Sequence, residues 1–229
     1  PIIGGSHDAL LEWAVRRSAC GLALLSEGSS AGLNRLGANQ VAMAAIHLHG
    51  APGESDENAN AAAVLAHPRL RDAVVIAFAR REQGLLTAPG NPLALTSLLD
   101  AVEKRARFGL RQGGAGAQLL LEKLIGEAGP LLELNAAPRP FATGQDLAFA
   151  LRAGEIDCGL ATRAAAEANG LGFLPLVWES FDMAMRRRSY FEPGPQRLLA
   201  LMREPEFRRQ AELLSGYDVS NAGAVRWNG

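Results

Sequence analysis

Short apolar runs alternate with polar loops and helical segments along this chain, and this alternation limits the folds it can adopt. Residues 1–3, 22–25 and 41–48 are apolar runs of strand length, and each is followed by a polar loop and a segment with helical spacing. Chains built this way form a mostly parallel sheet with helices on its faces. The predicted fold class is therefore α/β.

Two extended segments divide the chain into two lobes. The first, residues 80–88, ends at the strong breaker Pro89-Gly90-Asn91-Pro92, and the second is residues 181–185. We expect the chain to cross between lobes at both, so that lobe 1 comprises residues 1–83 plus 181–229 and lobe 2 comprises residues 84–180. Further strands are expected at 74–79, 107–110, 156–161 and 173–178, and helices at 9–19, 31–36, 61–66, 97–104, 117–127, 145–153, 162–169, 195–202 and 206–214.

The composition of the chain argues against several classes of function. The net charge of −1 over 229 residues gives no field that would recruit nucleic acid, so we expect DNA binding only through a domain before Pro1. Because no apolar run is long enough to span a bilayer and residues 1–5 have the pattern of a strand, we expect neither a membrane segment nor a signal peptide. The two cysteines, Cys20 and Cys158, fall in different expected lobes, which favours a reducing, cytoplasmic location.

Two glycine-rich segments follow predicted strands and precede predicted helices. Residues 111–117 (Arg-Gln-Gly-Gly-Ala-Gly-Ala) and 4–8 (Gly-Gly-Ser-His-Asp) would let the backbone approach a ligand. A helix start also offers free N–H groups and a partial positive charge, which suit an oxyanion. The alternatives are a tight packing turn in the first segment and a helix N-cap at Ser6 in the second. His7 and Asp8 are adjacent and point different ways, which argues against an acid–base pair.

Residues 28–32 (Gly-Ser-Ser-Ala-Gly) match G-x-S-x-G, the nucleophile elbow of α/β-hydrolases. A hydrolase would need an acid and then a histidine later in the chain, but His67 is the last histidine in the sequence. We therefore expect Ser29 and Ser30 to cap a helix or contact a ligand, and keep a hydrolase that uses Ser30 as an alternative.

His47 and His49 lie on one face of a strand end, and an acidic loop that contains Glu54, Asp56 and Glu57 follows. These residues could make a metal site, but a structural or ligand-contacting role for the histidines is favoured, so no metal ion is predicted. The run Arg186-Arg187-Arg188 is expected to be a solvated strand end.

Several segments together resemble a known family. Residues 5–8, 46–48, 84–92, 111–116 and 153–160 are similar to the PBP-like substrate-binding domain, which often follows a helix-turn-helix or excisionase-type DNA-binding domain in bacterial and archaeal regulators. That family is related to molybdate- and tungstate-binding periplasmic proteins, and the resemblance covers residues 3–190. The chain departs from the family pattern in the glycine-rich loop, where Ala115 stands for a serine and Gln118 lies near the place of a threonine.

The resemblance implies a two-lobed type II periplasmic-binding-protein fold that closes on a small anion, either molybdate- or tungstate-like or organic. It implies a ligand-sensing domain of a transcriptional regulator, without catalysis or cofactor; the oligomeric state stays open and includes a homodimer. A transport-type solute-binding protein is the alternative. The expected ligand-binding residues are Ser6, His7, Ser29, Ser30, His47, Arg111, Gly114, Ala115, Gly116, Thr143, Gly144, Gln145 and Thr162.

Overall fold

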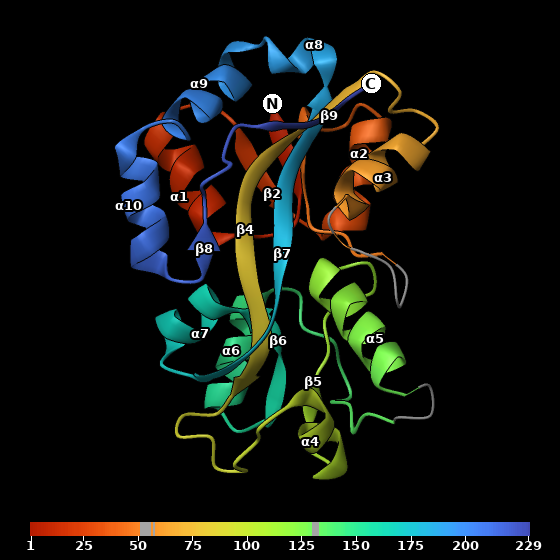
Figure 1. Ribbon diagram of the computed structural model, residues 1–229, viewed down its shortest axis with the longest axis vertical. Helices are drawn as coiled ribbons and strands as arrows, with labels where there is room; N and C mark the ends of the chain where they lie inside the picture. The colour runs from red at the N-terminus through yellow and green to blue at the C-terminus, as the bar shows by residue number, and fades with distance from the viewer. Residues whose placement is uncertain (51–55, 57, 130–132) are drawn as a thin grey trace.

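Two long strands join the two halves of the molecule. The computed structural model describes residues 1–50, 56, 58–129 and 133–229. Strands β4 (Ala73–Thr87) and β7 (Gly172–Arg186) run side by side through both halves, with β1, β2 and β3 at one end and β5 and β6 at the other (Figure 1). The predicted two-lobed α/β fold is confirmed.

One sheet extends through both lobes, with its seven main strands in the order β2-β1-β3-β7-β4-β6-β5. The pairs β1–β2, β1–β3 and β5–β6 are parallel, whereas β4 and β7 pair antiparallel with each other and with their outer neighbours. The remaining strands are β1 (Ile2–Gly5), β2 (Ala23–Ser26), β3 (Met43–Ile46), β5 (Phe108–Gly109), β6 (Cys158–Thr162), β8 (Tyr217–Asp218) and β9 (Val225–Asn228), and the last two pair with β4.

Helices flank the sheet in both lobes. Those of lobe 1 are α1 (Ala9–Ser18), α2 (Ser29–Gly37), α3 (Ala59–Ala66), α8 (Arg187–Tyr190), α9 (Pro193–Leu201) and α10 (Pro205–Leu214). Those of lobe 2 are α4 (Leu98–Glu103), α5 (Gly116–Ala128), α6 (Gly144–Arg152) and α7 (Arg163–Asn169). None of the helices in the described ranges is long and apolar enough to cross a membrane.

The two crossing strands are longer than the sequence indicated. Residues 74–79 and 80–88 were predicted as a strand and a separate extended segment, but β4 is continuous over both, and β7 likewise joins residues 173–178 to 181–185. Charged residues hid this continuity, because Arg81 and Glu179 interrupt the apolar pattern. The register pairs Arg81 with Glu179 across the two strands, so each charge has its partner inside the sheet.

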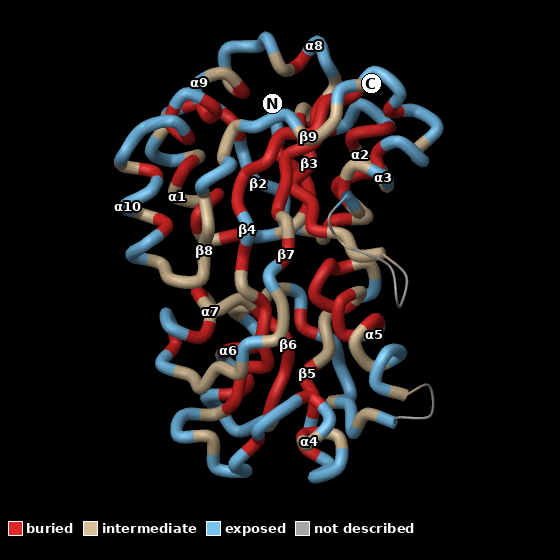
Figure 2. The backbone as a smooth tube through the Cα atoms, viewed as in Figure 1, coloured by how far each residue is buried: buried red, intermediate tan, exposed pale blue. Residues whose placement is uncertain are grey.

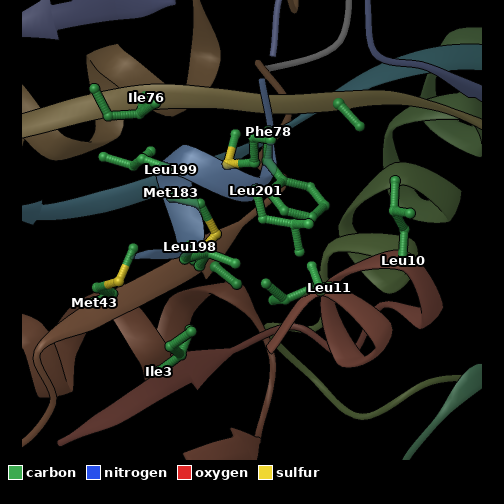
Figure 3. Packing of buried hydrophobic residues seen from close by; sticks show 14 of the residues in the cluster. Ile3, Leu10, Leu11, Met43, Ile76, Phe78, Met183, Leu198, Leu199 and Leu201 are labelled. Atoms are coloured by element: carbon green, nitrogen blue, oxygen red, sulfur yellow. The ribbon is translucent and has the colours of Figure 1, made fainter. Parts of the chain in front are cut away.

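Each lobe has its own hydrophobic core. In lobe 1, residues from α1, β3, β4, β7 and α9 pack together around Phe78 (Figure 3). The Phe78 ring contacts Phe181 and Phe207 edge-on. In lobe 2, Phe108 of β5 forms a cluster with residues from β4, α4, α5 and β6. Buried positions follow β3, β4, β6 and the lobe 1 part of β7, whereas β2 is exposed (Figure 2). Both cysteines are buried and free.

The structure modifies two local expectations. Asp8, not the alternative Ser6, is the N-cap of α1, because the Asp8 side chain accepts a hydrogen bond from the N–H of Leu11. The arginine run does lie at a strand end, since Arg186 is the last residue of β7, but Arg186 is bound to Asp72 and Asn39, and the exposed Arg187 and Arg188 begin α8.

Asp182 on β7 is a buried carboxylic acid with few hydrogen-bond partners. Its side chain is buried, and one carboxylate oxygen accepts from Asn60 Nδ2 at 2.8 Å. The other oxygen has no hydrogen bond, and Arg226 Nε lies 3.7 Å from it. Burial raises the pKa of Asp182 to about 6.

Replacing Asp182 by Asn should therefore stabilise the protein at neutral pH. The native state holds a proton on Asp182 between about pH 4 and pH 6 that the unfolded chain has lost, so this residue's contribution to stability falls as pH rises through that range. We expect Asp182→Asn to be more stable than wild type by roughly 2 kcal/mol at pH 8 and equal to it below about pH 4, measured by urea unfolding.

The control is Asp100→Asn. The pKa of Asp100 is lowered by the N–H of Thr96 and by Lys104, so this variant should lose stability at pH 8. Equal pH dependence of the two variants would contradict the assignment of Asp182.

Candidate functional site

A cavity of about 100 Å³ lies between the two lobes. Lobe 1 contributes the loops after β1, β2 and β3, the crossing strand β4 contributes Arg81 and Gln83, and lobe 2 contributes the starts of α5, α6 and α7. Because a water molecule occupies roughly 30 Å³ in the liquid, this volume suits a ligand of a few heavy atoms.

Most of the residues predicted for the site line this cavity: Ser6, His7, His47, Arg111, Ala115, Gly116, Gly144, Gln145 and Thr162. The other four lie just outside it. Ser29 is fully buried behind Ser6, and their hydroxyls share a hydrogen bond of 2.9 Å. Ser30 donates its N–H to the carbonyl of Gly114 at 3.4 Å, which joins the two lobes. Thr143 caps α6 through its hydroxyl.

Arg111 brings a cationic group to the lobe 2 side. Its Nε and Nη2 donate to the carbonyls of Phe141 and Ala142 at 3.1 and 2.7 Å, which holds the guanidinium in place. Burial lowers the pKa of Arg111 to about 10, so it stays charged at neutral pH. Within the described ranges, no carboxylate lies within ion-pair distance of this guanidinium.

Two helix starts point backbone donors toward the same cavity. Among the residues that the structure describes, the N–H groups of Gly116, Ala117, Gly144 and Gln145 have no backbone acceptor. The predicted donor Ala115 is different, because its N–H is bound to the carbonyl of Gln112 at 3.1 Å. The hydroxyl of Thr162 is likewise engaged, since it caps α7 by accepting from Ala165.

The sequence interpretation missed a buried charge network at the base of the cavity. Arg81 donates to Glu179 Oε1 from Nε and Nη2, and to Asp8 Oδ2 from Nη1 at 2.9 Å. Gln83 Nε2 donates to the same Glu179 oxygen, and the Tyr217 hydroxyl donates to Asp8 Oδ2. Burial alone would lower the pKa of Arg81, but the two carboxylates outweigh it and hold the guanidinium charged.

His47, His49 and Glu179 form a second buried group, which we call the histidine cluster. Glu179 Oε2 lies 3.0 Å from His47 Nδ1 and 3.1 Å from His49 Nε2, and Asp56 Oδ2 lies 2.9 Å from His49 Nδ1. Burial lowers the pKa of His47 to about 4, whereas Glu179 and Asp56 outweigh burial at His49 and raise its pKa. Of the acidic loop considered with the histidines, Glu54 and Glu57 lie outside the described residues.

Packing explains the G-x-S-x-G pattern. Gly28 has a φ of +92°, and a Cβ on Gly32 would lie 2.5 Å from the Cα of Gly5, so both positions require glycine. Ser29 Oγ accepts from the N–H of His47 at 2.9 Å, so it fixes the backbone, and among the described residues it forms no hydrogen bond with an imidazole. In the part of the chain that the structure describes, the Ser30 hydroxyl makes no hydrogen bond to any histidine.

Sequence comparison finds one matching family. A family model described as "PBP superfamily domain" matches residues 12–203. The protein YvgK of Bacillus subtilis (strain 168) is 25% identical over 150 residues, which cover 63% of this chain and 47% of YvgK. The chain thus spans about half the length of this curated relative.

Solved structures share the fold at low sequence identity. An ABC-type phosphate transport receptor from Vibrio cholerae is similar with a TM-score of 0.59 and 10% identity, over 94% of this chain and 98% of that one. The effector-binding domain of QuiR in complex with shikimate is similar with a TM-score of 0.57 and 12% identity, over 86% of this chain and 91% of that one. At these identities the similarity shows the fold alone.

Ser29→Ala should destabilise the protein, because the buried N–H of His47 would lose its acceptor. The expected cost is roughly 1–3 kcal/mol in the free energy of unfolding, measured by chemical denaturation. The neighbouring Ser30→Ala should change stability by less than about 0.5 kcal/mol. If both variants lost stability equally, the structural role of Ser29 would be wrong.

Proposed function

We propose, starting from the fact that the chain belongs to the PBP superfamily, that it is the ligand-sensing domain of a transcriptional regulator and closes its lobes on a small anion. Membership in this family makes it a ligand-binding domain. The sensing role and the anionic ligand are our proposals. The anionic ligand is supported by one observation: the charged guanidinium of Arg111 lies beside helix starts with free N–H groups.

The charges around the cavity support an anionic ligand. Arg111 is positioned by two carbonyls and would offer its charge to a bound group, while the N–H groups at Gly116 and Gly144 add hydrogen bonds and partial positive charge. The acids that line the cavity each have a cationic partner, since Asp8 is bound to Arg81 and Glu27 is bound to Arg35 through Oε2. Among the described residues, Glu27 Oε1 has no hydrogen-bond partner. Molybdate, tungstate and small organic anions fit this description.

Closure would work by population shift. Ser6 and His7 belong to lobe 1 and Arg111 and Gly116 to lobe 2, so a ligand that contacts both groups stabilises the closed arrangement. We propose residues 1–83 plus 181–229 and residues 84–180 as the two moving bodies.

We also propose that the domain binds without catalysing a reaction. Ser30, the nucleophile of the alternative hydrolase, has the carbonyl of Gly114 as its neighbour and no histidine bound to its hydroxyl among the described residues. DNA would then be contacted through another domain of a cytoplasmic protein, and a homodimer would suit such a regulator. The runner-up is a transport-type binding protein for a molybdate- or tungstate-like anion, supported by the fold shared with the phosphate transport receptor.

Arg111→Gln tests the anion site. Thermal shift should show a raised melting temperature with a subset of molybdate, tungstate, phosphate, sulfate and small carboxylates, because a ligand that binds only the native state stabilises it. Losing a charge-assisted hydrogen bond of roughly 1.5–3 kcal/mol should weaken binding at least about tenfold, measured by calorimetry.

Arg107→Gln is the matched control. Arg107 lies just before β5 and Arg111 shortly after it, but Arg107 is exposed and is bound to Asp157. Its affinity for the anion should stay unchanged. Equal affinity of wild type and Arg111→Gln would refute the assignment of the site.

To separate the two candidate roles, we would measure whether the full-length protein binds its own promoter DNA and whether the anion changes that affinity.

A further inference from the structure

We infer that the histidine cluster is a binding site for one divalent transition-metal cation of the zinc type. The three ligand atoms are His47 Nδ1, His49 Nε2 and Glu179 Oε2, and they lie within 4.8 Å of one another. They come from two different parts of the chain, the segment after β3 and the crossing strand β7. The site adjoins the cavity, which His47 lines, but none of its three ligands is Arg111 or a helix start, the groups on which the proposed anion function depends.

Two of the three spacings between donor atoms are close to those of a tetrahedral site. Zinc bonds of about 2.0–2.1 Å to nitrogen and oxygen place two ligand atoms of a tetrahedron about 3.4 Å apart. Here Glu179 Oε2 lies 3.0 Å from one imidazole nitrogen and 3.1 Å from the other. To bind a metal ion, these two distances would lengthen by a few tenths of an ångström, and the two histidine nitrogens, which lie within 4.8 Å of each other, would adjust to the same spacing. Two histidines and one glutamate also leave a fourth position open, as in catalytic zinc sites.

Outer partners already orient two of the three ligands. Asp56 Oδ2 lies 2.9 Å from His49 Nδ1, on the opposite side of the ring from the nitrogen that faces Glu179. This is the carboxylate–histidine–metal arrangement that fixes ligand orientation in metal sites. Glu179 is held through its other oxygen, Oε1, by Arg81 and Gln83, which leaves Oε2 toward the imidazoles.

The local charge balance admits a cation. Three carboxylates, those of Asp8, Asp56 and Glu179, face the cationic groups of Arg81 and Lys123. All three proposed ligands have buried side chains, at most 7% exposed, so an ion bound there would be shielded from water. Mixed nitrogen and oxygen donors suit Zn²⁺, whereas Mg²⁺ and Ca²⁺ prefer oxygen alone.

Calorimetry with the chelator-treated protein tests the site directly. We expect one equivalent of Zn²⁺ to bind and Mg²⁺ to give no binding, and Co²⁺ to develop the visible absorption of a coordinated ion. His49→Asn removes the ligand nitrogen but keeps an amide that can donate to Asp56. Asp56→Asn removes an outer partner and should weaken Zn²⁺ binding by roughly 10- to 100-fold. His49→Asn removes a ligand and should weaken Zn²⁺ binding by more than this.

Two controls separate lost binding from lost folding. His67→Asn removes a histidine outside the cluster, whose Nδ1 accepts from the N–H of Arg69, and should bind Zn²⁺ like wild type. Without metal, His49→Asn should retain the circular dichroism spectrum of wild type and lose only the rise in melting temperature that Zn²⁺ produces. The inference is overturned if wild type binds no stoichiometric Zn²⁺, if His49→Asn binds as tightly, or if His67→Asn loses as much affinity.

Discussion

The ion pair between Arg81 and Glu179 is the interaction on which the rest of the structure depends. The two residues face each other in register where β4 and β7 pass from one lobe to the other. Arg81 also binds Asp8, which caps α1, so the first strand–loop–helix unit is tied to both crossing strands. Burying such charges is costly, and removal of one partner would leave the other buried without compensation. The network therefore fixes the floor of the cavity.

This network links the two candidate sites without merging them. Glu179 accepts from Arg81 and Gln83 through one oxygen and faces His47 and His49 through the other. Arg111 and the N–H groups of the helix starts line the cavity from lobe 2, and Ser6 and His7 line it from lobe 1. His47 belongs to the histidine cluster and also lines the cavity, so the site proposed for a cation and the site proposed for an anion lie next to each other.

The sequence predicted what depends on local pattern and missed what depends on pairing across the fold. Alternating apolar runs and helical segments were enough for the α/β class. Gly113, Gly114 and Gly116 marked a loop at the cavity because the conformational freedom of glycine is a local property. Arg81 and Glu179 are 98 residues apart in the chain and become partners only through the register of two strands. Ser6 was a reasonable N-cap by residue type, but Asp8 is two positions closer to α1. Arg111 was predicted for the site, whereas its two carbonyl partners depend on a turn around residue 141 that no motif marks.

The contact between Tyr217 and Asp8 joins two parts of the chain that are synthesised at different times. Its hydroxyl binds Asp8, and the strand on which it lies pairs with β4, so the floor of the cavity combines residue 8 with residue 217. A ribosome releases the chain from its N-terminus, and a nascent chain that ends before this strand has all the lobe 2 donors but lacks one partner of Asp8. The floor of the cavity is therefore complete only once residue 217 has been synthesised, although the lobe 2 donors precede it in the chain.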